Sequence, residues 1–189
     1  AEPLQIYTRT RTAFDIIANT EVYQLGGTDL GGSDGFDTTW TGAPPDWTIG
    51  ASSTGTISNS TSIYQAGGHS VKLEGPALGT VSIYRDFSIR SGALTTITVY
   101  MNGDSGGTGG IARLQCLESE HYLTSAGGWQ TASSDLFTSA TGAFVAKTLD
   151  FTMEDEAVTA AEIATVRVTL IVESFGPICY YDTFSLVDP

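Results

Sequence analysis

The chain has 189 residues, with 8 Lys and Arg against 21 Asp and Glu, which gives a formal net charge of −13. This is the length of a single domain, and so acidic a protein is repelled by phosphate backbones and anionic lipids, which excludes nucleic acids and membrane surfaces as partners. Charged residues make up only 15% of the chain and 22 residues are glycine, a composition typical of an all-β protein with many turns. No apolar run approaches the roughly 20 residues that span a bilayer, and the first residues do not resemble a secretion signal, so we expect a soluble protein.

An extended N-terminal arm is predicted over residues 1–29. Residues 6–14 alternate with a period of two, as strands do, with threonines on one parity and Arg9 and Arg11 on the other. A glycine-rich, acidic stretch from Thr28 to Asp34 predicts a hinge. We therefore expect the arm to be followed by one domain over residues 30–189.

Arg9 and Arg11 place two of only 8 basic residues close together on one face of the predicted arm. A cationic face on an acidic protein can dock onto the carboxylates of a neighbouring subunit. Charges on an exposed strand edge also discourage aggregation, which is the alternative interpretation. We expect Arg9 and Arg11 to contact a subunit.

Short alternating segments with turn residues between them fill the rest of the chain, which predicts an all-β domain. The clearest segments are residues 70–74, 80–89, 94–101, 111–118, 143–151, 165–172 and 179–187. One helix is predicted over residues 154–164, where Thr159 and Glu162 fit a capping box. Many strands and almost no helix favour a two-sheet β-sandwich.

The two cysteines leave two interpretations open. Cys116 and Cys179 both lie in strand-like segments, where a cysteine is often a small buried hydrophobic residue. A single disulfide between them is the other interpretation, although two cysteines do not make a disulfide scaffold.

No catalytic constellation emerges from the sequence. His69 and His121 are the only histidines, and neither lies in a nucleophile-elbow or metal-binding motif. The acidic segment around Glu118 and Glu120 is typical of a solvated polar edge rather than of a metal site. We therefore expect a protein that is not an enzyme.

A sugar-binding face is a more specific hypothesis than a catalytic site. Sugars stack their C–H faces on aromatic rings and pair their hydroxyl groups with planar polar side chains. The strand parity that points Val81 and Ile83 inward predicts that their neighbours point outward. Half-buried sheet residues or a subunit contact would show the same aromatic pattern. The candidates for this outer face are Tyr84, Asp86, Tyr100, Arg113 and Gln115, with Trp129 at its edge.

The body of the chain resembles the jelly-roll carbohydrate-binding modules. The resemblance begins at Gly35-Phe36-Asp37, continues through Pro45-Asp46-Trp47 and the segment from Tyr64 to Leu73, and ends at Tyr181-Asp182-Thr183-Phe184-Ser185-Leu186. It implies a β-sandwich and glycans as partners. Such strands are mostly core and turn residues, so the resemblance supports the fold more strongly than the activity.

The same resemblance implies a structural calcium ion. In that family an acidic residue of the opening strand and the Asp of the closing strand often share the ion, and the matching positions here are Asp37 and Asp182. Two carboxylates and backbone carbonyls supply the hard oxygen ligands that calcium prefers. Asp37 is shorter than the Glu usual in the family, and the alternative is that both carboxylates accept backbone hydrogen bonds.

The N-terminal segment is similar to opening segments of structural proteins in tailed-bacteriophage virions, on residues 10–18 and 22–27. This resemblance implies a non-catalytic decoration or cement protein on the outer capsid surface. Its partners would be the major capsid protein or identical subunits, with Arg9 and Arg11 at the contact, because an arm can pair with a neighbour's sheet edge. The alternative is a secreted, extracellular carbohydrate-binding module that serves a glycan-active enzyme.

Overall fold

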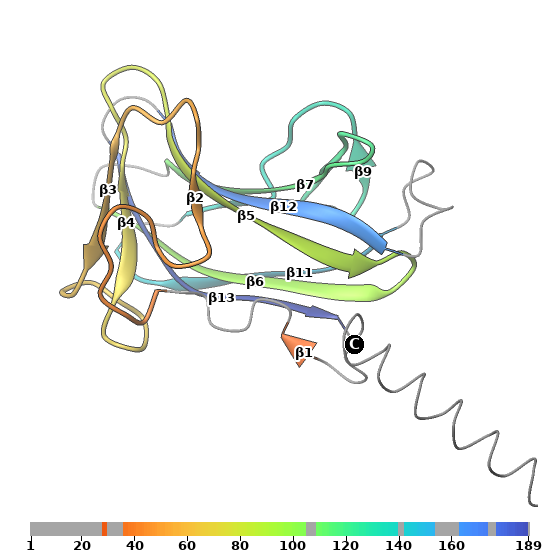
Figure 1. Ribbon diagram of the computed structural model, residues 1–189, viewed down its shortest axis with the longest axis horizontal. Coiled ribbons are helices and arrows are strands. Elements are labelled where there is room, and N and C mark those ends of the chain that lie inside the picture. Colours follow the sequence, from red (N-terminus) through yellow and green to blue (C-terminus); the bar gives the residue numbers. More distant parts are fainter. Residues whose placement is uncertain are drawn as a thin grey trace, which may run out of the picture.

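The computed structural model describes residues 28–29, 36–104, 109–139, 142–153, 163–173 and 177–188. Every regular element within these residues is a β-strand. The strands form two antiparallel sheets that pack face to face, with β13, β6 and β11 in the lower layer of Figure 1 and β5, β12 and β7 in the upper layer. None of these residues belongs to a helix with the length and hydropathy of a membrane span.

Sheet A contains the long strand β13 at its centre. Its order is β11 (Val145–Thr152), β6 (Leu94–Gly103), β13 (Ile178–Asp188), β4 (Ser70–Glu74) and β3 (Thr56–Ser60). The short strand β1 (Thr28–Asp29) pairs with the last residues of β13. The strand that ends the domain is therefore hydrogen-bonded on both sides.

Sheet B is built around β12. Its order is β2 (Thr48–Ile49), β5 (Val81–Arg90), β12 (Ile163–Val172), β7 (Gly110–Cys116), β8 (Tyr122–Leu123) and β9 (Trp129–Gln130), while β10 (Phe137–Thr138) also pairs with β7. Neighbours in both sheets are mostly distant in sequence, so the chain crosses repeatedly from one sheet to the other. The domain is thus the two-sheet β-sandwich that the strand pattern predicts, with the jelly-roll fold that the resemblance implies.

The core lies between the sheets because each long strand alternates inward apolar and outward polar residues. In β6 the buried residues Ile97, Val99 and Met101 alternate with half-buried Thr96, Thr98 and Tyr100. The strand β12 shows the same alternation, with Val166 and Val168 fully buried. This period of two fixes which side chains each sheet presents to solvent.

Tyr181 links the two sheets through the core. Its side chain extends from β13 and is completely buried. The hydroxyl group donates to the carbonyl oxygen of Ile171 at 2.6 Å and accepts the N–H of Ile111 at 2.9 Å, both in sheet B. Burial raises the pKa of Tyr181 well above its ordinary value, so the phenol stays protonated and donates.

A bulge in β13 changes the direction of its side chains. The register with β6 shifts between Asp182 and Ser185, and the extra residue Thr183 has a φ of 45°. Phe184 consequently points into the core, where its ring lies 5.3 Å from that of Phe87 and 5.6 Å from that of Trp47. Asp182 is left on the outer face of sheet A.

The predicted helix and the predicted N-terminal arm differ from the structure where the structure describes them. The predicted helix over residues 154–164 is wrong at its end, because Ile163 and Ala164 begin β12; pairing with β5 overrides their weak helical preference. Residues 154–162 lie outside the described residues. Of the predicted arm, only Thr28 and Asp29 are described, and they form β1 rather than a hinge.

Both cysteines are free and buried, so the interpretation as small hydrophobic residues is confirmed. Cys116 belongs to β7 in sheet B and pairs with Val166, whereas Cys179 belongs to β13 in sheet A and pairs with Gly103. Burial raises the pKa of the Cys179 thiol to about 12, which leaves it unreactive at neutral pH.

Candidate functional site

A row of polar and aromatic side chains crosses the outer face of sheet B. Asp86 of β5 lies opposite Arg167 of β12, which lies opposite Gln115 of β7. Gln115 lies opposite Tyr122 of β8, which in turn lies opposite Gln130 of β9. Residues opposite one another in an antiparallel sheet share a face, so these five side chains share the solvent side of sheet B.

A second row runs beside the first. Tyr84 of β5 pairs with Thr48 of β2 on one side and with Thr169 of β12 on the other. Thr169 lies opposite Arg113 of β7. Tyr84 is two residues from Asp86, and Arg113 is two residues from Gln115, so the two rows are adjacent on one face.

Arg167 has the most constrained position on this face. Its Nε donates to Oδ1 of Asp86 at 2.7 Å and its Nη2 donates to Oδ2 at 2.8 Å. The guanidinium carbon lies 4.0 Å from the centroid of the Tyr84 ring. The hydrogen bonds from Arg167 to Asp86 raise the pKa of Arg167 above its ordinary value. Such a bidentate, stacked guanidinium group presents its remaining N–H donors in a fixed direction.

Arg113 is held by two carboxylates. Its Nε donates to Oδ1 of Asp135 at 2.7 Å and its Nη2 donates to Oε1 of Glu173 at 3.2 Å. Asp135 precedes β10, and Glu173 directly follows β12. Arg113 therefore joins two loops at one end of the outer face of sheet B.

The arrangement offers a fixed set of donors and acceptors for a polyhydroxylated ligand. The guanidinium groups donate, the carboxylates accept, and the amide of Gln115 does both. Within the described residues the Gln115 amide has no hydrogen-bond partner. Tyr122 adds a half-buried aromatic ring beside Gln115. These groups suit ligands with many hydroxyl groups and an apolar face.

The structure brings together four of the residues predicted to bind sugar. Tyr84, Asp86, Arg113 and Gln115 lie on the outer face of sheet B, as expected. Tyr100 does not join them, because β6 belongs to sheet A and Tyr100 lies opposite Ala146 and Asp182 there. Strand parity predicts correctly that Tyr100 points outward, but parity carries no information about which sheet a strand joins.

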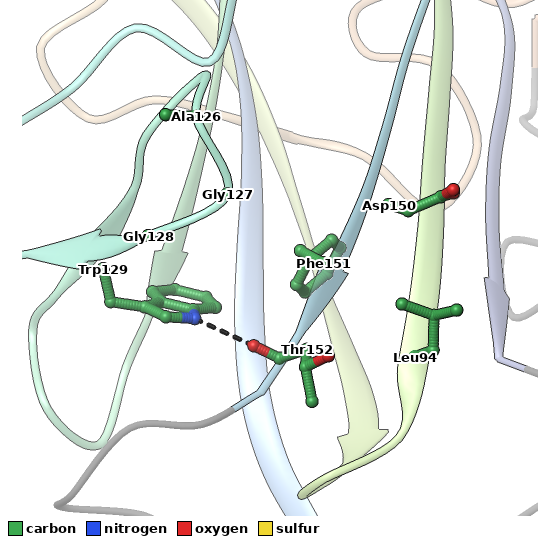
Figure 2. A pocket seen from close by; sticks show the side chains of 8 residues that line it. All are labelled: Leu94, Ala126, Gly127, Gly128, Trp129, Asp150, Phe151 and Thr152. Carbon is green, nitrogen blue, oxygen red and sulfur yellow. Dashed lines mark hydrogen bonds between the residues drawn. The ribbon is translucent and has the colours of Figure 1, made fainter.

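Trp129 also lies away from this face. Its indole N–H donates to the carbonyl oxygen of Thr152 at 3.1 Å, and its ring contacts that of Phe151 at a centroid distance of 6.0 Å. The indole thus bridges the edge strand β9 of sheet B and the edge strand β11 of sheet A. Figure 2 shows it beside a cavity at this edge.

Arg167 and Tyr122 are members of the outer face that were not among the predicted residues. Arg167 alternates with the buried Val166 and Val168, so the same parity argument that places Tyr84 outward would have identified it. Tyr122 lies in a strand of two residues, Tyr122–Leu123, which is too short to show any period. Only the pairing of β8 with β7 brings Tyr122 beside Gln115.

Asp37 and Asp182 are brought close together at the other sheet. Asp182 is completely buried and accepts the backbone N–H groups of Gln65, Ala66 and Thr183. Burial raises the pKa of Asp182, and the nearby charge of Asp37 adds to the effect. The carboxylate of Asp37 packs against Gly67, where any side chain would overlap it.

These contacts allow a test of the calcium hypothesis. The three N–H groups occupy both oxygens of Asp182, which fits the alternative that this carboxylate accepts backbone hydrogen bonds. No group of three or more His, Cys, Asp or Glu side chains converges among the described residues. A calcium ion would therefore need Asp37, Asp182 and several backbone carbonyls. The calcium site at Asp37 and Asp182 stays a prediction.

Arg9 and Arg11 lie outside the described residues. The subunit contact expected of them also stays a prediction.

No protein-family model and no curated protein matches this sequence. Solved structures do match. The chain is similar to the CBM22-2 xylan-binding domain of Paenibacillus barcinonensis Xyn10C, with 13% identity, a TM-score of 0.53, and coverage of 87% of this chain and 99% of that domain. It is also similar to a family 16 carbohydrate-binding module, with 15% identity, a TM-score of 0.50, and coverage of 70% and 85%.

A third similar structure is the enzymatically active domain of bacteriophage CBA120 tailspike protein 4. The identity is 11% and the TM-score is 0.54. The alignment covers 75% of this chain but only 19% of the tailspike chain. At such identities the likenesses show the fold alone. The domain has the jelly-roll fold that carbohydrate-binding modules share.

Proposed function

We propose that this domain binds glycans through the outer face of sheet B and carries no catalytic role of its own. The observation that supports this most is the Arg167 guanidinium group, which is fixed by Asp86 and stacked on Tyr84 beside Gln115, whose amide has no partner among the described residues. Binding costs less when the polar groups are already held in place. The likeness of the fold to sugar-binding modules supports the same proposal.

The charges of this face favour neutral glycans. Arg113 and Arg167 are both already paired with carboxylates, from Asp135, Glu173 and Asp86. An anionic glycan would approach these carboxylates and a protein of net charge −13, so repulsion opposes it. Neutral hydroxyl groups pair with both the donors and the acceptors.

Affinity electrophoresis through gels that contain neutral polysaccharides tests the proposal. Tyr84→Ala and Gln115→Ala should weaken retardation about tenfold or more, which corresponds to about 1.4 kcal/mol. Tyr100→Ala is the matched control, because Tyr100 is a half-buried, outward tyrosine on the opposite sheet. Equal retardation of Tyr84→Ala, Gln115→Ala and the unmodified chain would overturn the proposal, as would the absence of retardation by every neutral polysaccharide.

A second candidate function is decoration of a phage capsid, with the major capsid protein or identical subunits as partners. The likeness of the fold to part of a phage tailspike protein favours it. So does β1, because the pairing of Thr28 and Asp29 with β13 ties the start of the domain to sheet A. An arm that precedes β1 would then leave the domain from a fixed point and reach a neighbour.

Deletion of residues 1–27, which preserves β1, tests this second candidate. Under the decoration hypothesis the full chain cosediments with capsids or forms a defined oligomer in light scattering, and the deleted chain does neither. Glycan affinity should be unchanged by the deletion, since the outer face of sheet B is intact. Full attachment of the deleted chain would contradict the role of the arm.

A further inference from the structure

A cavity of about 460 Å³ opens at the edge of the sandwich where β9 and β11 approach each other. Figure 2 shows the turn over residues 126–128 and Trp129 on one side of it, and residues of β6 and β11 on the other. Its volume lies in the range of small-ligand sites. The lining residues are Leu94, Ala126, Gly127, Gly128, Trp129, Asp150, Phe151 and Thr152.

Trp129 is held in one orientation beside this cavity. The hydrogen bond from its Nε1 to Thr152 and the edge-on contact with the ring of Phe151 fix the indole from two directions. The indole is only partly buried, so it retains surface for a ligand. An aromatic ring held in place by the fold loses little entropy when a ligand stacks on it.

The turn beside the indole contains two glycines, and packing does not explain the second of them. At Gly127 φ is 86°, a conformation that favours glycine. Gly128 has no such requirement, and the nearest atom to a Cβ placed there would be Oγ1 of Thr124 at 3.8 Å. A Cβ would therefore fit at Gly128, and the turn does not require a glycine there.

The opposite wall combines an apolar and an anionic side chain. Leu94 lies opposite Thr152 in the register of β6 with β11 and is 54% exposed. Oδ1 of Asp150 accepts the hydroxyl of Thr96 at 2.6 Å. Its Oδ2 has no hydrogen-bond partner among the described residues and remains an acceptor. The lining contains no Lys or Arg and includes the carboxylate of Asp150, so its side chains favour a neutral ligand over an anionic one.

We propose that this edge cavity is a second ligand site that takes one neutral sugar residue. The partly exposed indole and Leu94 match the C–H face of a sugar ring, and the free oxygen of Asp150 accepts from a hydroxyl group. The cavity and the outer face of sheet B share no lining residue, since Trp129 points away from that face. The two sites are therefore independent.

The indole N–H resonance of Trp129 reports directly on this cavity. The chain has 3 tryptophans, and Trp129→Phe assigns the resonance by its disappearance. In nitrogen-15 correlation spectra of the full chain, methyl glycosides of glucose, galactose, mannose and xylose are titrated one at a time. We expect at least one of them to shift the Trp129 resonance in a saturable way, with a Kd of about 1 mM, as one small contact surface allows.

Gly128→Leu puts a bulky side chain at a lining residue where a Cβ meets nothing closer than 3.8 Å. We expect it to abolish the shift and to leave the melting temperature unchanged. Leu94→Asn should weaken it several-fold, whereas Leu78→Asn, at an 81% exposed leucine in the turn before β5, should not. Tyr84→Ala should leave the shift intact, because it alters only the outer face of sheet B. No shift with any of the glycosides, an equal shift in Gly128→Leu, or loss of the shift in Tyr84→Ala would overturn the second site.

Discussion

Arg167 is a residue whose proposed role in binding can be separated from its contribution to folding. Its bidentate pair with Asp86 is partly exposed, with side-chain accessibilities of 33% and 38%. Ion pairs of this kind contribute only about 0–1 kcal/mol to stability. Their geometry nevertheless orients the guanidinium group on the Tyr84 ring, and this orientation is what the proposed glycan site requires.

Arg167→Lys separates these two effects. Lysine keeps the charge but has neither the planar fork nor the stacking surface. We expect the free energy of unfolding in urea to change by less than about 1 kcal/mol, and the glycan affinity measured by calorimetry to fall tenfold or more. Arg85→Lys is the control, because Arg85 pairs with the buried Val168 on the inner side of sheet B and contacts Phe87 and Asp46. Unchanged affinity in Arg167→Lys would show that the guanidinium group is not part of the site.

Asp182 is a buried carboxyl group whose charged form is disfavoured by burial. Its pKa in the folded protein is raised by burial, so the native state favours the protonated form. The stability that this group contributes is therefore fully present below its ordinary pKa and is lost as the pH rises through its raised folded pKa. Carbon-13 titration of the carboxyl group should show the raised value in calcium-free buffer, and a value at or below 3.8 would contradict it.

A bound calcium ion would oppose the rise in the pKa of Asp182. A divalent cation beside Asp182 lowers the pKa of that carboxyl group and stabilises the native state. If calcium binds, the melting temperature at neutral pH rises with added calcium, falls with chelator, and responds to neither in Asp37→Asn. A melting temperature that chelator leaves unchanged would remove the calcium hypothesis and leave Asp182 as an acceptor of backbone hydrogen bonds.

At the scale of elements, the close approach of β7 to β13 depends on one glycine. A Cβ on Gly110 would lie 2.1 Å from Sγ of Cys179, so Gly110→Ala forces the two sheets apart. We expect it to lower the free energy of unfolding by about 1–3 kcal/mol, measured by urea denaturation. The double variant Gly110→Ala, Cys179→Ala should recover part of the loss.

Gly128→Ala is the matched control, since a Cβ there meets nothing closer than 3.8 Å. Equal stability of Gly110→Ala and Gly128→Ala would mean that the sheets do not approach as closely as described.

The long strands were predictable because their side chains alternate. The segments expected over residues 80–89, 94–101 and 165–172 correspond to β5, β6 and β12 within a few residues. The short strands β8 and β9 have two residues each and show no period. Pairing of β8 with β7, and of β9 with β8, creates them rather than local preference.

The candidate site was predictable only in part, because alternation shows which way a side chain points but not which sheet its strand joins. Alternation places Tyr84, Asp86, Arg113 and Gln115 outward, and the structure confirms that they share a face. Tyr100 follows the same rule but belongs to the opposite sheet. Long-range strand pairing decides the partition between sheets, and no local pattern encodes it.

The whole molecule is an acidic domain whose proposed ligand is uncharged. The net charge of −13 repels anionic polysaccharides over distances of about 10 Å at 0.1 M salt. We expect neutral polysaccharides to bind with an affinity that salt does not change, and anionic ones not to bind at low salt. Calorimetry at two salt concentrations measures both. Tighter binding of an anionic polysaccharide than of any neutral one would contradict the charge argument.

The central claim is that one face of the sandwich, the outer face of sheet B, binds glycans. The most direct measurement is a map of amide chemical shifts for the nitrogen-15-labelled full chain, titrated with oligosaccharides from the neutral polysaccharide that retards it most. The account predicts that the largest shifts follow the rows that cross β5, β12 and β7, around Tyr84, Arg167 and Gln115. Shifts confined to the outer face of sheet A, around Tyr100, would contradict it.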